Sequence, residues 1–143
     1  MGNMPLYQQF LGNWELIPLT CVYEQGDAPI AGTYSIEETG STLTFHMGWT
    51  DADGGQHDYS FGATSDGKPK PFRGGDLADS ISVTAVSEKE LNSAAYKAGK
   101  ELMLAQRTLS DDGDYMEVRQ IVRLPDLTEP SNFARYRRVK YSQ

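Results

Sequence analysis

The chain has 143 residues, of which 38% are hydrophobic and 23% charged, a composition typical of a soluble globular domain and not of a disordered chain. Its net charge of −7, from 20 acidic and 13 basic residues, repels phosphate backbones and anionic lipids. This charge argues against nucleic acid or a membrane surface as a partner. We expect one domain spanning residues 1–143.

The number of cysteines and the first residues of the chain indicate in which cellular compartment the protein is expected. The single cysteine, Cys21, allows no intrachain disulfide. No charged leader is followed by an apolar run, and no apolar run approaches the roughly 18 residues that a membrane-spanning helix needs. A cytoplasmic location is therefore the expectation, and the alternative is a mature form from which a leader has been removed.

The first expected element is a short helix. Pro5 suits a first helical position and Gly12 suits a stop, and Leu6, Phe10 and Leu11 fall on one helical face between them. One or two turns covering the end of a larger structure fit this pattern.

Strands follow at once. Residues 14–23 are strand-like, with Pro18 near the middle, and residues 32–38 form the next expected strand. Because proline cannot donate a hydrogen bond to a neighbouring strand, we expect the first strand to bend, bulge or lie exposed at Pro18.

The clearest pattern in the chain is an alternation over residues 43–50. Its apolar positions are Leu43, Phe45, Met47 and Trp49. Period two over eight residues predicts a half-buried strand. After an Asp- and Gly-rich turn at 51–55, the pattern continues on His57, Tyr59 and Phe61, which predicts an antiparallel hairpin.

Later segments repeat this rhythm. We expect further strands at 70–73, 81–83, 91–96, 102–109, 116–122 and 133–141. Turn residues recur at intervals typical of sandwiches and barrels, and no helix longer than the first is expected. Consecutive hairpins favour an all-β, single up-and-down antiparallel β-barrel of about 8–10 strands.

At this point several motifs resemble those of a known group. The segment Gly12-Asn13-Trp14 resembles the Gly-x-Trp start of lipocalins and fatty-acid-binding proteins, the calycin group. The segments at 49–55, 66–69, 74–81 and 107–113 are similar to turns of a mostly uncharacterised family of small bacterial lipocalin-like proteins. The resemblance spans roughly residues 8–124. It implies a closed barrel with an internal cavity that binds small, largely apolar molecules, and it implies no reaction.

The resemblance also assigns roles to the two ends of the chain. It implies that Trp14 packs at the closed end under an arginine of the last strand, either Arg135 or Arg137. Fatty-acid-binding proteins hold a carboxylate with an Arg-x-Tyr on that strand, but here Ala134 precedes Tyr136 in place of the arginine.

The inward positions of the barrel are the candidate ligand site. An apolar pocket with a few polar groups is what a hydrophobic ligand requires. The predicted ligand-binding residues are Phe45, Met47, Trp49, His57, Tyr59, Phe61 and Arg107. Arg107 alternates with apolar residues and should face inward, where it must either meet a carboxylate such as Glu101 or Glu117 or hold an anionic head group. Arg119 has the opposite phase and should face solvent.

We expect no metal and no cofactor. Neither zinc-ligand spacing nor a Gly-rich phosphate loop is present, and His46 and His57 fall on opposite faces. The first functional hypothesis is non-catalytic binding of a small hydrophobic or amphipathic molecule. One alternative is a lipid-modifying, isomerase- or cyclase-like enzyme using His57 or Tyr59. The other is a filled barrel that acts as an interaction or structural module. The oligomeric state cannot be inferred from the sequence.

Overall fold

The computed structural model describes residues 5–71 and 78–140 as one β-barrel with a single short helical turn. Its elements are η1 (Leu6–Phe10), β1 (Gly12–Tyr23), β2 (Ala31–Thr39), β3 (Thr42–Thr50), β4 (Gln56–Thr64), β5 (Lys70–Pro71), β6 (Ser80–Ser87), β7 (Glu90–Lys97), β8 (Lys100–Leu109), β9 (Tyr115–Val122) and β10 (Ser131–Arg138). Parts of three predictions, at residues 72–73, 74–77 and 141, lie outside the described residues. No helix in the described ranges is long and apolar enough to cross a membrane.

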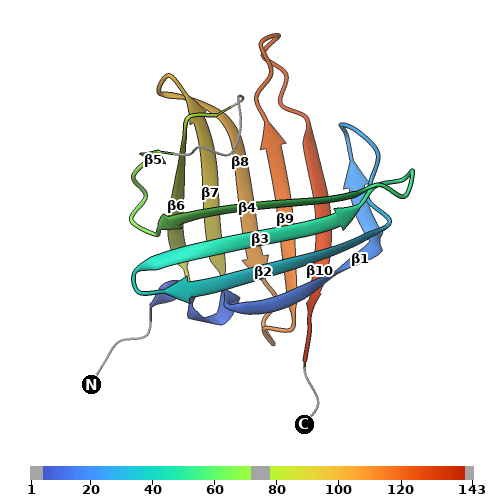
Figure 1. Cartoon of the computed structure of the whole chain (residues 1–143), viewed down its shortest axis with the longest axis horizontal. Coiled ribbons are helices and arrows are strands. Elements are labelled where there is room, and N and C mark those ends of the chain that lie inside the picture. The colour runs from blue at the N-terminus through green and yellow to red at the C-terminus, as the bar shows by residue number, and fades with distance from the viewer. Residues whose placement is uncertain (1–4, 72–77, 141–143) are drawn as a thin grey trace.

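The strands form one antiparallel sheet in the order β4-β3-β2-β1-β10-β9-β8-β7-β6-β5. Each strand pairs with its neighbours in sequence, except that β4 and β5 lie at the two edges of the sheet and do not pair with each other. Strand β1 pairs with β10, which brings the two ends of the chain together. Figure 1 shows the sheet curling round so that β2, β3 and β4 cross in front of β6 to β9. The predicted up-and-down barrel is confirmed, with ten strands.

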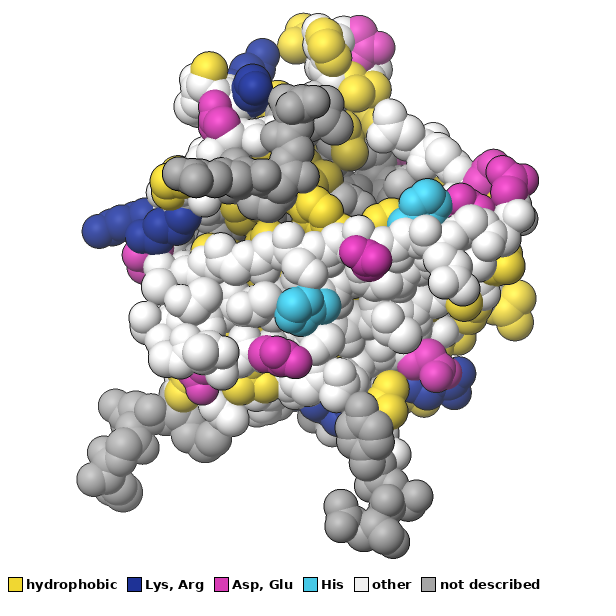
Figure 2. All heavy atoms as spheres, viewed as in Figure 1, with side chains coloured by type: hydrophobic (Ala, Val, Ile, Leu, Met, Phe, Trp, Pro, Cys, Tyr) yellow, Lys and Arg dark blue, Asp and Glu magenta, His cyan; other side chains and the backbone are white. Residues whose placement is uncertain are grey.

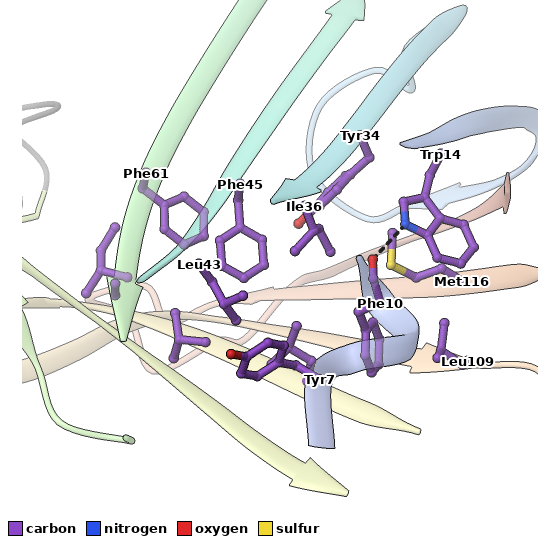
Figure 3. Packing of buried hydrophobic residues seen from close by; sticks show 14 of the residues in the cluster. Tyr7, Phe10, Trp14, Tyr34, Ile36, Leu43, Phe45, Phe61, Leu109 and Met116 are labelled. Carbon is purple, nitrogen blue, oxygen red and sulfur yellow. Dashed lines mark hydrogen bonds between the residues drawn. The ribbon is translucent and has the colours of Figure 1, made fainter. Parts of the chain in front are cut away.

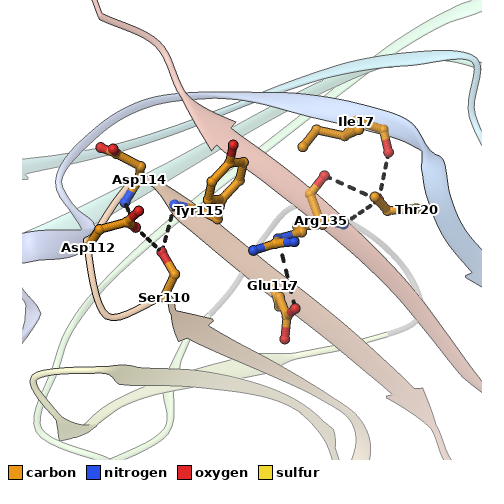
Figure 4. Close-up of polar contacts among 8 residues, drawn as sticks. All are labelled: Ile17, Thr20, Ser110, Asp112, Asp114, Tyr115, Glu117 and Arg135. Atoms are coloured by element: carbon orange, nitrogen blue, oxygen red, sulfur yellow. Dashed lines mark hydrogen bonds and ion pairs between the residues drawn. The ribbon is translucent and has the colours of Figure 1, made fainter.

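Strand β1 is irregular where proline interrupts it, as the sequence predicts. Its register with β10 shifts between Ile17 and Val22, on either side of Pro18. The Thr20 hydroxyl donates to the carbonyl of Ile17 (2.6 Å) and accepts from the amide of Arg135 (2.9 Å), as Figure 4 shows. A side chain thus replaces part of the ladder that proline disrupts.

The N-terminal turn covers one end of the barrel, but the side chains that it buries against the barrel are not all the predicted ones. It is a 3₁₀ turn, so residues three apart lie on the same side, and Tyr7 and Phe10 are buried. Leu6 is 44% exposed, contrary to the α-helical expectation. The Tyr7 hydroxyl donates to the Glu38 carboxylate and so links the turn to β2.

The core fills this end of the barrel. Phe10 and Trp14 are almost completely buried, and the indole Nε1 of Trp14 donates to the carbonyl of Phe10 (3.1 Å), as Figure 3 shows. Ile36, Leu43 and Met116 pack around them. Full burial of each such large apolar side chain stabilises the fold by about 1.5–3 kcal/mol. This end is therefore closed, and any cavity must lie further along the barrel.

The outer wall formed by β2, β3 and β4 differs from the rest of the surface. All 13 Lys and Arg residues of the chain follow residue 67, so none lies on these strands. Figure 2 shows a broad, mostly uncharged wall with scattered acidic and histidine side chains, and with dark blue side chains only at the margins of the view.

Candidate functional site

A cavity of about 330 Å³ lies inside the barrel, beyond the packed end. Much of its wall is apolar and comes from the inward faces of five strands. These residues are Met47, Phe61, Met103, Ala105, Val118 and Ala134. Tyr23, the loop residues Asp27 and Pro29, and Asp51 of the β3–β4 turn also border it, so the cavity extends to the end of the barrel opposite η1.

Arg107 is a basic residue of the cavity wall, and it is only 1% exposed. Its Nε donates to the Tyr34 hydroxyl (2.6 Å), and its terminal nitrogens donate to the Ser93 hydroxyl (2.9 Å) and the Leu91 carbonyl (3.4 Å). The guanidinium carbon lies 4.5 Å from the centroid of the Phe45 ring. A guanidinium has five N–H donors, so donors remain on its terminal nitrogens. The predicted inward orientation of Arg107 is confirmed.

The predicted carboxylate partners of Arg107 are wrong. Glu101 pairs instead with Arg123 (2.7 Å), and Glu117 lies on the outer face of β9 near Arg135 (4.0 Å; Figure 4). Within the described ranges, no carboxylate forms an ion pair with Arg107. Glu117 fails as a partner because it alternates with the inward residues Met116 and Val118, so its side chain points away from the barrel interior.

Two tyrosines that sequence reasoning did not assign to the site lie beside Arg107. The rings of Tyr34 and Tyr136 meet edge to face, with centroids 5.3 Å apart. Burial raises the pKa of Tyr136, so its hydroxyl keeps its proton at neutral pH. No hydrogen-bond partner of that hydroxyl is found among residues 5–71 and 78–140. The alternation of residues along each strand places both tyrosines on the inner face of the sheet. Their contact with each other cannot be read from the sequence, because it depends on the closure of the barrel.

Five of the seven predicted ligand-binding residues line the cavity, namely Met47, Trp49, Tyr59, Phe61 and Arg107. Burial raises the pKa of Tyr59. Phe45 does not line the cavity, since it is completely buried in the core and stacks on Phe61 with centroids 4.6 Å apart. It forms the floor beneath Arg107 instead.

His57 also lies off the cavity wall, contrary to the pocket placement predicted for it. Its side chain is 48% exposed at the rim, where Nε2 lies 2.7 Å from Asp51 Oδ2. The ring stacks on Trp49 with centroids 5.4 Å apart. The hydrogen bond from His57, together with amides of the turn, holds the pKa of Asp51 below its usual value. This carboxylate at the barrel mouth explains why His57 is held outside.

The described residues include no cluster of side chains suited to bind a metal ion. No group of three or more His, Cys, Asp or Glu side chains in those ranges is placed to hold an ion. Cys21 has a free, partly buried thiol, and burial raises the pKa of this thiol. Arg119 is exposed and lies over the ring of Phe133 on the outer face, as its phase predicts.

The barrel resembles solved structures of ligand-binding proteins. It is similar to a Schistosoma mansoni fatty-acid-binding protein in complex with arachidonic acid, with a TM-score of 0.63 and 16% sequence identity over 95% of this chain and 100% of that chain. It is also similar to zebrafish ileal bile-acid-binding protein complexed with cholic acid, with a TM-score of 0.59 and 11% identity over 92% and 99% of the two chains. The siderocalin Ex-FABP matches with a TM-score of 0.50 and 10% identity over 94% and 77%.

These similarities establish the fold, which is a calycin-type barrel like that of the fatty-acid-binding proteins, and they confirm the predicted fold class. Neither a protein-family model nor a curated protein matches the chain by sequence. The narrower resemblance to bacterial lipocalin-like proteins stays a prediction.

Proposed function

We propose that this protein binds a small amphipathic molecule inside the barrel, with the anionic head group on Arg107 and the apolar part along the cavity wall. The observation that carries the proposal is Arg107 itself. It is a buried cation that borders a cavity and forms no ion pair with a carboxylate of the described residues. Removing a charge from water costs several kcal/mol unless an opposite charge compensates it. A ligand carboxylate would supply that charge.

The groups around Arg107 suit an anion. A carboxylate can accept two parallel N–H bonds from one guanidinium, and such charge-assisted bonds are short and strong. The Tyr136 hydroxyl lies on the same part of the wall and has a proton to donate. Two of the structurally similar proteins are described in complex with arachidonic acid and cholic acid, both of which carry a carboxyl group.

The volume of the cavity limits the ligand. At about 330 Å³, it is near the lower end of the range of roughly 300–1,000 Å³ found for small-molecule pockets. A medium-chain carboxylate therefore fits the proposal better than a bulky ligand. Met47, Phe61 and Val118 would contact its apolar part.

Binding of decanoate and of the uncharged analogue decanol, measured by calorimetry, tests the proposal. The variant Arg107→Met should lose about 10- to 100-fold in decanoate affinity, since hydrogen bonds to charged groups contribute about 1.5–3 kcal/mol. The matched control is Arg119→Met, which removes an exposed outer-face arginine and should bind decanoate like the wild type. Equal affinity for decanol and decanoate, or an unaffected Arg107→Met variant, would contradict the proposed role of Arg107.

A non-catalytic role and a cytoplasmic location are part of this proposal. The rim position of His57, off the cavity wall, supports the first, because an acid or base must come within hydrogen-bond reach of the reacting group. Recovery of unchanged ligand after prolonged incubation is the expected result. Turnover that is lost in His57→Ala or Tyr59→Phe, with binding retained, would instead show that the protein is an enzyme.

A further inference from the structure

Gln120 contributes an amide to the cavity wall. It lies on β9 and points inward, between Val118 and Val122 along the strand and opposite Ala105 on β8. Its Nε2 donates to the sulfur of Met103, and a thioether is a weak acceptor. Among the described residues, no donor is found for its carbonyl oxygen. The folded barrel therefore leaves most of the hydrogen-bonding capacity of this amide unused.

The polar neighbours of Gln120 are already engaged. Asn132 is its direct partner across β9 and β10, but the Asn132 carbonyl accepts from the amides of Glu24 and Gln25, and its nitrogen donates to the Gln25 carbonyl. Ser93, in the same row of inward residues, accepts from Arg107. Neither side chain is bonded to the amide of Gln120.

Gln120 is half-buried, so water can reach its amide in the empty barrel. A purely apolar ligand that displaced this water would leave the amide without a good partner, at a cost of about 1–3 kcal/mol. An apolar residue at position 120 would avoid that cost and extend the wall formed by Val118 and Met103. The position is therefore better suited to a ligand that offers a polar group there than to a plain hydrocarbon.

Gln120 is also close to the proposed head-group site. Arg107 pairs with Val118 across β8 and β9, and Gln120 is two residues further along β9. Such diagonal neighbours are about 7–8 Å apart, which long side chains can span. A single small ligand can reach both groups.

We infer that the ligand is an oxygenated amphiphile, with a hydroxyl or carbonyl group on its apolar part that hydrogen-bonds to Gln120 while its anionic head lies on Arg107. This inference rests on the proposed function and adds the class of ligand. The amide serves either kind of group, since its nitrogen donates and its oxygen accepts. A plain saturated chain would leave it unpaired.

The test compares decanoate with a series of decanoates hydroxylated at successive carbons. In the wild type, one or two adjacent positional isomers should bind about three- to tenfold more tightly than decanoate, as one hydrogen bond implies. In Gln120→Leu that preference should disappear, and decanoate itself should bind at least as well as before. The control Gln106→Leu changes a glutamine of β8 on the outer face and should keep the preference.

The outcomes separate this inference from the proposed function. If decanoate binds through Arg107 but no isomer is preferred, or if Gln120→Leu keeps the preference, then the inference is wrong and the proposed function stands. If no carboxylate of the series binds, or if Arg107→Met binds all of them unchanged, then the proposed function fails and the inference fails with it. The isomer series in the wild type needs no variant, so misfolding of Gln120→Leu would not leave the question open.

Discussion

Arg138 lies across the indole of Trp14, with its guanidinium carbon 4.2 Å from the ring centroid. The two residues are direct partners across β1 and β10. Sequence reasoning expected an arginine here but named Arg135 or Arg137. Those two occupy outward positions, whereas Arg138 has the inward phase of Ala134 and Tyr136. Arg138 also donates to the carbonyls of Gln9, Leu11 and Gly113, and so ties the ends of three segments together.

Arg138→Ala should therefore destabilise the barrel strongly. The loss of a cation–π contact and of charge-assisted hydrogen bonds predicts a decrease of roughly 2–4 kcal/mol in the free energy of unfolding, measured in urea. Arg137→Ala is the matched control, because Arg137 is exposed and forms only a surface ion pair with Glu15 (3.5 Å). Such pairs contribute about 0–1 kcal/mol. A similar loss in both variants would show that Arg138 has no special role.

The unliganded protein should not depend on Arg107 for stability. A buried charge costs several kcal/mol in lost hydration unless an opposite charge compensates it, and an apolar residue of similar volume avoids that cost. Arg107→Met should therefore unfold at the same or a higher urea concentration than the wild type. The acceptors it leaves behind on Tyr34 and Ser93 border the cavity, which limits the cost of losing their donor.

A loss of several kcal/mol in Arg107→Met would mean that the arginine holds the fold together, and weakened decanoate binding could then not be assigned to the head group. Circular dichroism of the folded variant at low temperature provides the necessary control for its structure.

The hydrogen bond between Tyr7 and Glu38 predicts a loss of stability in alkali. The hydrogen bond to the Glu38 carboxylate is the main cause that raises the pKa of Tyr7 from 10.0 to about 12, with smaller contributions from burial and from the charge of Glu38. Between pH 10 and 12 the unfolded chain releases this proton while the folded chain retains it. Stability from this group is therefore complete below pH 10 and is lost as the pH rises through about 12.

Urea unfolding of the wild type and of Tyr7→Phe across this pH range measures the effect. The difference in unfolding free energy between the two proteins should shrink steadily as the pH rises, because only the wild type has this proton to lose. A constant difference across the range would contradict a linkage through Tyr7. Glu38→Gln, which keeps an acceptor but removes the charge, should show a weaker pH dependence.

Leu127 offers a stabilising substitution. It lies in the loop between β9 and β10 with a backbone φ of 69° and a side chain that is 90% exposed. The left-handed conformation costs a leucine about 1–3 kcal/mol, whereas asparagine adopts it more readily. Leu127→Asn should raise the unfolding free energy by up to about 1 kcal/mol. The same substitution at the partly buried Leu124 should lower it, and a destabilised Leu127→Asn would show that the exposed side chain has a packing role.

The sequence alone determined which residues face inward along β3, β4 and β8. Period-two alternation placed Met47, Tyr59 and Arg107 inside, and the register of the sheet bears this out. The turn residues fixed the order of the hairpins, and Pro18 marked the irregular point of β1. These features are local, since they depend on backbone geometry within a few residues.

Only the tertiary structure decided what meets across the barrel and how deep each group lies. Arg107 and Tyr34 are 73 residues apart, and only the closure of β1 on β10 brings their strands to face each other. The same closure gives Arg107 the hydroxyl of Tyr34 in place of the expected carboxylate, and it assigns Phe45 to the core and His57 to the rim. Alternation gives the side of the sheet but neither the depth along the barrel nor the opposite wall, because both depend on how the strands stagger when the sheet closes.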